Sequence, residues 1–408
     1  MPKKYKMIDL FAGCGGLTEG FMDTKCYSEI AAVEWLKPQV DTLRYRLKTK
    51  WNEKDADQRV LYFDIQRESE LYAGWNDPEF GVGVGLDYFV NKSNGIDVII
   101  GGPPCQAYSI AGRVRDENNM QQDYRNYLFE HYLNVVNRYK PTLFVFENVP
   151  GILSAAPNGT EITTLIKQGF NSIGYDIIDD IGAYATVNAC DYGVAQNRVR
   201  VIIVGLRKKK FEDTQGVLKN FYTNILPKYK SGKIITVKEK IGDLPKCLPL
   251  FDKENHRKRI SHTTPKCEIS GHIPRYANLR DMDTFKILAK DIETGKREFD
   301  SQKISELYEK KIGSKSPIHR YHVLEPDKPS TTIIAHLYKD GNRFIHYDSK
   351  QQRTITVREA ARLQSFPDDF EFMGSRGSAY QMIGNAVPPL LANAIAKAIY
   401  ELLVMEGK

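Results

Sequence analysis

The chain contains a cysteine in a setting that suits nucleophilic chemistry. Cys105 lies in the stretch GGPPCQAYS (101–109), directly after the apolar run 96–100. Between the end of a strand and the start of a helix, backbone N–H groups and the helix dipole lower the pKa of a thiol. Pro103 and Pro104 restrict the backbone beside it, which suits a site that holds one side chain in place. We therefore predict that Cys105 is a nucleophile; the alternative is the commoner role of a small buried apolar residue.

One carboxyl group and two guanidinium groups are candidates for the same site. Glu147 closes the apolar run in FVFENVPG (144–151), where an unpaired carboxylate would be costly. A buried acid can keep its proton near neutral pH, or share it with a ring nitrogen of a substrate. Arg198 and Arg200 alternate along the start of a later strand, so they share a face and could hold a carboxylate, a phosphate or a base carbonyl.

A glycine turn and a following acid indicate a nucleotide-type cofactor. Gly13, Gly15 and Gly16 allow a tight turn and close approach to a ligand, although such turns also serve as plain strand-to-helix connections. Glu34 follows at the distance where a carboxylate can accept both hydroxyls of a ribose. The turn AGCGG (12–16) lacks the full G-x-G-x-x-G spacing and has no basic residue for a pyrophosphate. An adenosyl cofactor without phosphates therefore fits better than NAD.

Two further residues are candidates for binding the adenine, and each could have a structural role instead. Trp35 could stack on the adenine or be a core residue. Asp64 could reach the adenine amine or cap the next helix.

Short apolar runs alternate with helical patterns through the first two hundred residues. Strands are expected in YKMIDLF, SEIAAVEW, RVLYFDI, IDVIIGG, TLFVFEN and RVIIVGL, and a helix in RNYLFEHYLNVVNRYK. This alternation predicts an α/β fold with a doubly wound, mostly parallel sheet, in which ligands bind at the carboxyl ends of the strands. The residues that fall at these ends are Phe11 to Gly16, Glu34, Asp64, Cys105 and Glu147.

The pattern becomes irregular after residue 208, and amphipathic helical spacing returns in TVREAARLQSF and PPLLANAIAKAIYELL. We therefore expect a catalytic and cofactor-binding domain over 1–208, a smaller irregular domain over 209–324, and a segment over 325–408 that completes the first domain.

Composition narrows the class of protein. The polar N-terminus and the absence of a long apolar stretch favour a soluble cytosolic protein with no membrane partner. Six cysteines without C-x-x-C pairs favour reduced thiols. Residues 205–275 contain 17 Lys/Arg and 7 Asp/Glu, a net charge of +10, whereas the rest of the chain sums to −3. This concentration favours a polyanion partner, with a solvated polar face as the alternative.

Several histidines and cysteines fall in the irregular segment, and a metal site is the alternative to weigh there. Their spacings match no standard zinc pattern, so we expect no metal and predict DNA-facing or incidental roles. These residues are Cys247, His256, His262, Cys267 and His272.

Six stretches, in this order and spacing, resemble the DNA (cytosine-5)-methyltransferases: DLFAGCGGLTEGF, GGPPCQAYS, FENVPG, YGVAQNRVRVIIVG, TVREAARLQSFPDDF and YQMIGNAVPP. The resemblance covers nearly the whole chain outside about 209–320, and the length resembles that of a bacterial or phage modification enzyme. It implies a Rossmann-like methyltransferase fold, double-stranded DNA as the substrate, and a target-recognition role for 209–324.

The resemblance also implies a role for each matched residue. Cys105 would attack C6 of a cytosine, so that C5 accepts the methyl group, and Glu147 would hydrogen-bond N3 and the exocyclic amine. Arg200, assisted by Arg198, would hold O2. S-adenosylmethionine would be the donor and S-adenosylhomocysteine the product. The implied cofactor residues are Phe11, Cys14, Gly16, Glu34, Trp35, Asp64, Ile65, Pro104, Leu128 and Asn385.

Further implications concern access to the base and the cellular setting. The cytosine must leave the duplex, and the segment 110–126 resembles the family's mobile catalytic loop. Thr331 and Thr332 are expected near the flipped base. Tyr108, Val199 and Ala386 stand where phenylalanine, glutamate and serine are common in the family, and none of them replaces a catalytic residue. A nearby-encoded restriction endonuclease without a stable complex, a monomeric state, and a bacterial cytosol or nucleoid location are implied.

Four alternative functions remain to be weighed. A tRNA-acting member of the same family would share these motifs. An amino-methyltransferase would carry an aromatic residue after the two prolines, where this chain has Cys105. A DNA-binding module without catalysis would not need Cys105, Glu147 and Arg200 together. A Cys–His hydrolase would need a histidine beside the thiol, and His131, in a helical pattern, is the only histidine before residue 256.

Overall fold

The computed structural model describes residues 4–104, 128–156, 159–314, 321–339 and 341–408. It divides into two compact units. The first unit comprises Met1–Gly193, Arg198–Lys233 and Ala386–Lys408, and the second comprises Val194–Asn197 and Ile234–Asn385. These bounds differ from the expected domain boundaries, because 209–233 lie in the first unit and 325–385 in the second. The assignment of DNA recognition to either unit stays a prediction.

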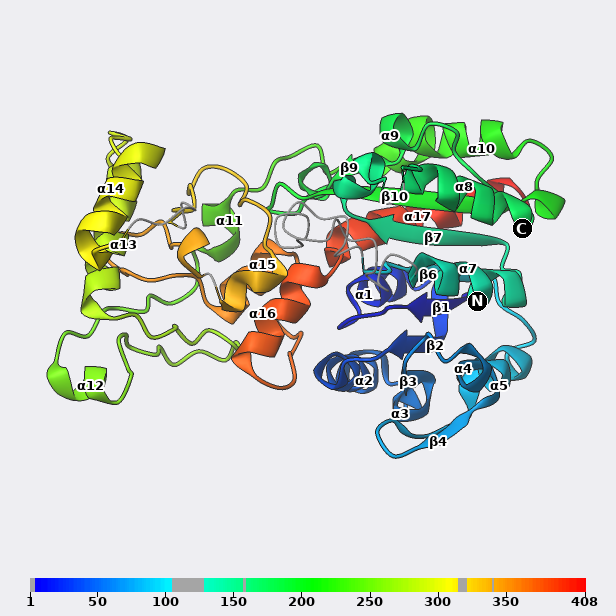
Figure 1. The fold of residues 1–408 in the computed structure, drawn as a ribbon, viewed down its shortest axis with the longest axis horizontal. Helices are drawn as coiled ribbons and strands as arrows, with labels where there is room; N and C mark the ends of the chain where they lie inside the picture. The colour runs from blue at the N-terminus through cyan, green and yellow to red at the C-terminus, as the bar shows by residue number, and fades with distance from the viewer. Residues whose placement is uncertain (1–3, 105–127, 157–158, 315–320, 340) are drawn as a thin grey trace. The chain divides into compact units, whose positions relative to one another are not determined.

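The first unit is built on a large sheet (Figure 1). The described strands follow the order β3-β2-β1-β6-β7-β10-β8, with β9 beside β10. Neighbours from β3 to β7 are parallel, and β10 runs antiparallel to β7, β8 and β9. The expected doubly wound, mostly parallel sheet is therefore confirmed. The strands are β1 (Tyr5–Leu10), β2 (Tyr27–Glu34), β3 (Val60–Tyr62), β6 (Val98–Gly101), β7 (Leu143–Asn148), β8 (Tyr175–Ile177), β9 (Thr186–Asn188) and β10 (Val199–Arg207).

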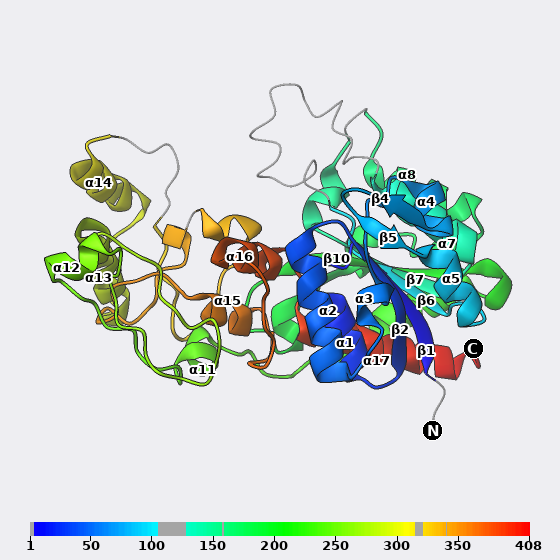
Figure 2. The ribbon, with the colours of Figure 1, turned by 90° about the horizontal axis from the view of Figure 1, so that it is seen from below.

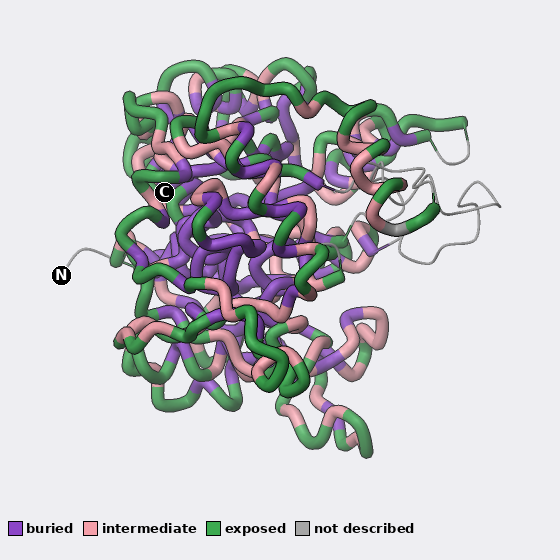
Figure 3. The backbone as a smooth tube through the Cα atoms, turned by 90° about the vertical axis from the view of Figure 1, so that its left-hand side faces the viewer, coloured by how far each residue is buried: buried purple, intermediate pink, exposed green. Residues whose placement is uncertain are grey.

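Helices cover both faces of this sheet. Figure 2 shows α1, α2 and α17 on one face and α4, α5, α7 and α8 on the other. The strands buried between these layers are mostly apolar, as expected for parallel strands covered on both faces, with Asp9 and Glu29 among the buried charged exceptions, and Figure 3 shows this buried interior. The helices of this unit are α1 (Gly16–Asp23), α2 (Lys37–Trp51), α3 (Ala56–Arg59), α4 (Glu68–Ala73), α5 (Gly85–Lys92), α7 (Leu128–Tyr139), α8 (Ile162–Ser172), α9 (Ile181–Tyr184), α10 (Thr214–Asn220) and α17 (Pro389–Met405). A separate hairpin pairs β4 (Trp75–Asp77) with β5 (Gly81–Gly83).

The C-terminal helix α17 packs against α1, at the other end of the sequence. A methyl group at Gly20 would lie 2.4 Å from Cβ of Ala392, so glycine permits the close approach of the two helices. Among the described residues, the stretch 376–405 is long and apolar enough to cross a membrane by length and composition, which differs from the sequence expectation. Because 67% of its most apolar window is buried inside the protein, this apolar character is that of a core helix.

The second unit is mainly helices and loops. Its apolar core includes Met282, Phe285 and Leu288 of α13 together with Tyr321, Val323 and Ile345, and α14 packs against it through Ile304, Leu307 and Tyr308. A second buried contact is polar: Arg353 donates two hydrogen bonds to the Glu359 carboxylate, at 2.7 and 2.6 Å. The helices are α11 (Val237–Ile241), α12 (Lys253–Arg257), α13 (Leu279–Glu293), α14 (Ser301–Ile312), α15 (Val357–Leu363) and α16 (Arg376–Asn385).

Candidate active site

The carboxylate of Glu34 is fixed at the carboxyl end of β2 by three backbone donors. Oε2 accepts from N of Gly13 at 2.9 Å, and Oε1 accepts from N of Trp35 at 2.9 Å and of Leu36 at 2.8 Å. Burial raises the pKa of Glu34, and these hydrogen bonds oppose the rise. The glycine turn after β1 and the acid that ends β2 therefore meet, as the sequence predicts for neighbouring parallel strands.

The turn between β1 and α1 has a strained backbone. Phe11 has φ +56°, a left-handed conformation that is uncommon for a residue with a bulky side chain. Gly13 has φ +57°, and a Cβ atom at that position would meet no atom within 4 Å, so the backbone borders open space. Such strain gathers at ligand sites. Cys14 is buried, and burial raises the pKa of its thiol.

Trp35, Asp64 and Ile65 lie at the ends of β2 and β3. Trp35 is 46% exposed, so the alternative that it is a core residue is wrong. Oδ1 of Asp64 accepts from N of Gln66 at 3.0 Å. The cap of α4 is a different residue, Arg67, so the capping alternative for Asp64 is also wrong. Ile65 is buried.

Glu147 and Arg200 form an ion pair across two antiparallel strands. Nε of Arg200 lies 3.0 Å from Oε1 of Glu147. In the register of β7 and β10, Ile202 lies opposite Glu147, which places Arg200 diagonally on the same face. Both residues are more than 90% buried. Burial raises the pKa of Glu147 and lowers that of Arg200, and in each case the partner's charge opposes the shift.

The backbone that leads to Cys105 runs beside this pair. A methyl group at Gly102 would lie 2.5 Å from Oε2 of Glu147, so only glycine leaves room for the carboxylate. Nδ2 of Asn148 donates to the carbonyl of Pro103 at 3.3 Å. Cys105 itself, and the expected catalytic loop 110–126, lie outside the described residues. The sequence analysis missed Gly102 and Asn148, although both adjoin residues that it singled out.

Arg198 takes a different position from Arg200. It is 1% exposed, and its Nη2 donates to the carbonyl of Ala386 at 2.9 Å. Its backbone is held by β9 and the residue that follows, since N donates to Oδ1 of Asn188 and the carbonyl accepts from N of Ala189. Burial lowers the pKa of Arg198, and the nearby charge of Arg200 adds to this effect.

The remaining expected site residues are placed as follows. Pro104 is exposed at the end of the described segment, and Leu128 is buried at the start of α7. Asn385 is exposed at the end of α16 and belongs to the second unit, as do Thr331 and Thr332.

The histidine and cysteine residues of the second unit bind neighbouring protein groups. His262 Nε2 lies 2.9 Å from the carbonyl of Gln351, and His272 Nε2 lies 2.8 Å from that of Pro245. Cys247 Sγ is 3.6 Å from Nε2 of His272. Over the described ranges, no three His, Cys, Asp or Glu side chains are grouped as metal ligands would be.

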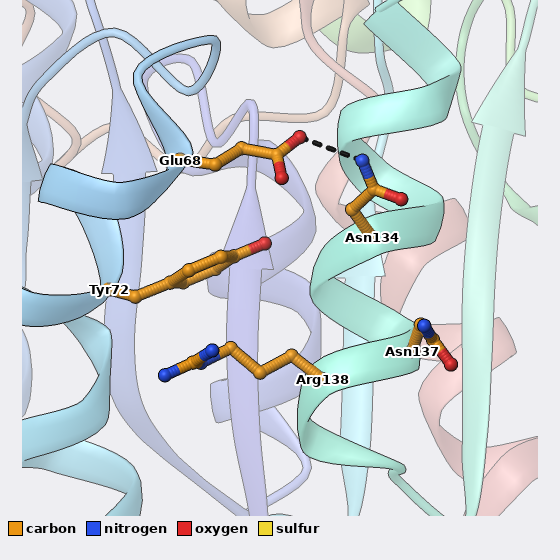
Figure 4. A pocket seen from close by; sticks show the side chains of 5 residues that line it. All are labelled: Glu68, Tyr72, Asn134, Asn137 and Arg138. Carbon is orange, nitrogen blue, oxygen red and sulfur yellow. Dashed lines mark hydrogen bonds between the residues drawn. The ribbon is translucent and has the colours of Figure 1, made fainter.

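A surface pocket lies between α4 and α7, and none of the expected site residues is among those that line it (Figure 4). Its polar groups contact one another: Oε1 of Glu68 accepts from Nδ2 of Asn134 at 2.8 Å, and Arg138 pairs with Asp87. His131 Nδ1 lies 2.5 Å from the same Glu68 oxygen.

Comparison with known proteins adds independent evidence. The family described as C-5 cytosine-specific DNA methylase matches residues 5–401. The type II methyltransferase M.Bpa9945I of Bacillus paralicheniformis is 33% identical, with 97% of this chain and 99% of that protein covered. The type II methyltransferase M1.HphI of Haemophilus parahaemolyticus is 31% identical, with 97% and 86% covered.

Solved structures agree with this match. A candidate DNA modification methyltransferase encoded within a prophage (E. coli) is 27% identical, with a TM-score of 0.59 over 98% of this chain and all of that one. The Dnmt2 methyltransferase of S. pombe, 15% identical, has a TM-score of 0.55 over 99% of this chain and all of that one, and shares the fold. The match along almost the entire length shows that the chain is a methyltransferase and belongs to the C-5 cytosine-specific DNA methylase family.

Proposed function

We propose that the protein transfers a methyl group from S-adenosylmethionine to C5 of a flipped-out cytosine in a specific duplex DNA sequence. The observation that carries the proposal is the buried Glu147–Arg200 pair, which lies against Gly102, three residues before Cys105. Glu147 and Arg200 thus lie beside the backbone at Gly102 that leads to Cys105. This is at the carboxyl ends of β6 and β7, where ligands of such sheets bind.

The residues around the glycine turn fit an adenosyl group. Glu34 has an acceptor position left on Oε2 for a ribose hydroxyl, since about four lone-pair positions are available and three backbone donors use the others. Trp35 presents an exposed indole beside this carboxylate. The open space at Gly13 lets the backbone approach a ligand closely. S-adenosylmethionine, when bound, supplies an electrophilic methyl group.

The protein's own groups would carry the reaction as follows. The thiolate of Cys105 forms a bond to C6 of the cytosine, and the electron pair of the C5–C6 double bond becomes available at C5. Glu147, whose pKa burial raises, donates a hydrogen bond to N3 and thereby stabilises the electron-rich ring. Arg200 holds O2 while its Nε remains on Glu147. Once C5 carried the methyl group, a solvent water molecule would take the C5 proton, the electron pair of that C–H bond would re-form the C5–C6 double bond, and the thiolate would be expelled from C6.

We also propose that DNA is contacted by a finger in the second unit (residues 248–263). Its two arms pair through N of Leu250 and the carbonyl of Ser261 at 2.9 Å, and α12 closes its tip. Phe251, 60% exposed, stands beside this helix. The finger carries four exposed basic side chains and two acidic ones, so it suits a polyanion with a stackable base. The basic residues are Lys253, Arg257, Lys258 and Arg259.

The other half of the basic segment is less suited to this role. In the first unit, Lys228 pairs with Glu401 and Lys230 with Asp191. These exposed pairs add little to stability, but they neutralise part of the charge of this half. In the finger, Lys258 pairs in the same way with Glu254. The names of the type II relatives support a role in modifying DNA beside a cognate endonuclease. We also propose that the chain acts as a monomer in the bacterial cytosol.

The proposal is tested by transfer of label from S-adenosylmethionine. Purified protein is incubated with mixed-sequence duplex DNA and, separately, with tRNA, and methylated cytosines are mapped by bisulfite sequencing. Methylcytosine within one short DNA motif, absent with Cys105→Ser, is the expected result. Label in tRNA alone would replace DNA as the substrate, and no label in either from protein that binds S-adenosylhomocysteine would overturn the proposal.

A further inference from the structure

The two arginines on either side of Val199, the first residue of β10, contact different groups. Arg200 pairs with the catalytic candidate Glu147, whereas Nη2 of Arg198 donates to the backbone carbonyl of Ala386 at 2.9 Å. With 1% of its surface exposed, Arg198 has little area to offer a substrate. Its main chain is also fixed on both sides by β9 and Ala189, so the direction of the side chain is well determined.

The group that Arg198 holds belongs to the segment that returns to the first unit (residues 386–388, the returning segment). Its central residue, Val387, is buried, and a methyl group at Gly16 would lie 2.4 Å from the Val387 carbonyl. The returning segment is thus in van der Waals contact with the glycine turn on one side. On its other side it is hydrogen-bonded to the buried guanidinium of Arg198.

We propose that Arg198 is a positioning residue for the cofactor: it fixes the returning segment against the glycine turn and does not hold the cytosine. The chain of contacts runs from Arg198 to Ala386, along the backbone to Val387, and from there to Gly16 and the turn that carries Phe11 and Gly13. If this contact is lost, the returning segment can move away from the turn, and the cofactor site loses its fixed shape. This inference rests on the proposed binding of an adenosyl cofactor at the turn.

The neighbouring arginine provides a matched control. Arg198→Met and Arg200→Met each remove one buried guanidinium from the same strand end and keep a long unbranched side chain. Binding of S-adenosylhomocysteine to the full-length protein without DNA is measured by calorimetry. We expect Arg198→Met to weaken binding by about tenfold, the effect of one lost hydrogen bond to a charged group, and to leave DNA affinity unchanged. Arg200→Met should bind S-adenosylhomocysteine like the wild type and lose methyl transfer.

Two results would overturn the inference. One is an Arg198→Met protein that binds S-adenosylhomocysteine like the wild type; the other is equal weakening by both variants. If Arg198→Met does not fold, Arg198→Lys takes its place, since lysine keeps the positive charge but lacks the planar fork of the guanidinium. Its binding of S-adenosylhomocysteine is then compared with that of the wild type and of Arg200→Met. Failure of the wild type to bind S-adenosylhomocysteine would instead contradict the proposed function, so the two failures are distinguishable.

Discussion

Nε of Arg200 lies 3.0 Å from Oε1 of Glu147, and both side chains are almost completely buried at adjoining strand ends. Two opposing charges removed from water gain little stability as a pair, because desolvation offsets their attraction. The pair lies at the end of the sheet where the predicted nucleophile follows β6. We therefore infer that the two charges serve the reaction rather than the stability of the fold.

The first prediction concerns this acid. Glu147→Gln keeps the shape of the side chain and an N–H donor but removes the acidic proton that can be shared with N3, so the single-turnover rate of methyl transfer should fall by about 100-fold or more. The affinity for S-adenosylhomocysteine should be retained. Glu29→Gln is the matched control, since Glu29 is a buried carboxylate in β2 with an arginine, Arg59, 3.7 Å away. Equal rates for Glu147→Gln and the control would contradict the assigned role.

The second prediction concerns adenine stacking. Trp35 is exposed and supports no core, so Trp35→Ala should leave the melting temperature unchanged. Loss of the stacked indole should weaken binding of S-adenosylhomocysteine by about tenfold or more, as measured by calorimetry. Tyr88→Ala removes a similarly exposed aromatic from α5 and should have no effect on binding. If both variants bind like the wild type, the adenine does not lie on Trp35.

The third prediction concerns the finger. Replacement of Arg257, Lys258 and Arg259 by alanine should weaken DNA binding and reduce the slope of log affinity against log salt by about 2 to 3, one ion-release step for each lost phosphate contact. The matched control removes the exposed lysines 286, 290 and 303 from α13 and α14. Fluorescence anisotropy at four salt concentrations measures the DNA affinity and its salt dependence for both triple variants. Identical slopes for the two triple variants would place the DNA elsewhere.

The fourth prediction concerns pH and stability. Asp9 in β1 is fully buried, accepts a 2.6 Å hydrogen bond from Thr18, and has no partner for Oδ1 within the described chain. Burial raises its pKa to about 8. The folded protein therefore keeps this proton while the unfolded chain releases it near pH 4, so the group's contribution to stability falls as pH rises from about 4 to 8, at up to about 1.4 kcal/mol per pH unit.

Asp9→Asn imitates the protonated carboxyl and should flatten this decline. Unfolding by denaturant is followed at pH 5, 6, 7 and 8, with Asp57→Asn on the exposed helix α3 as the control. The decline should be smaller in Asp9→Asn than in either other protein. Parallel curves for all three would show that Asp9 is ionised in the folded state.

Much of the sheet could be predicted from the sequence, because β1, β2, β6, β7 and β10 are mostly apolar runs that are buried in the unit. The strands β8 and β9 escaped prediction, since each has only three residues and, unlike the equally short β3 in RVLYFDI, was not singled out by a longer apolar run. The domain boundaries also differed. Residues 325–385 have amphipathic helices like those of the first unit, and which core a helix joins depends on contacts that the pattern does not encode.

The site was partly predictable for a similar reason. Parallel neighbours place their carboxyl ends together, so the meeting of Glu34 with the glycine turn followed from strand order. The pairing of Glu147 with Arg200 required the register of β7 and β10, which the sequence leaves open. The contact of Arg198 with Ala386 joins segments almost two hundred residues apart, and alternation along one strand predicted the same face for both arginines but not their different partners.

The central claim, a covalent bond between Cys105 and the target cytosine, is tested most directly by trapping it. Once the methylated motif is known, duplex DNA with 5-fluorocytosine at the target position is incubated with S-adenosylmethionine and the protein; fluorine at C5 replaces the proton whose loss frees the enzyme. We predict a complex that survives denaturation and whose DNA adduct maps to Cys105 by mass spectrometry, absent in Cys105→Ser. Methylation of the natural motif without any trapped complex, or an adduct on another residue, would contradict the account.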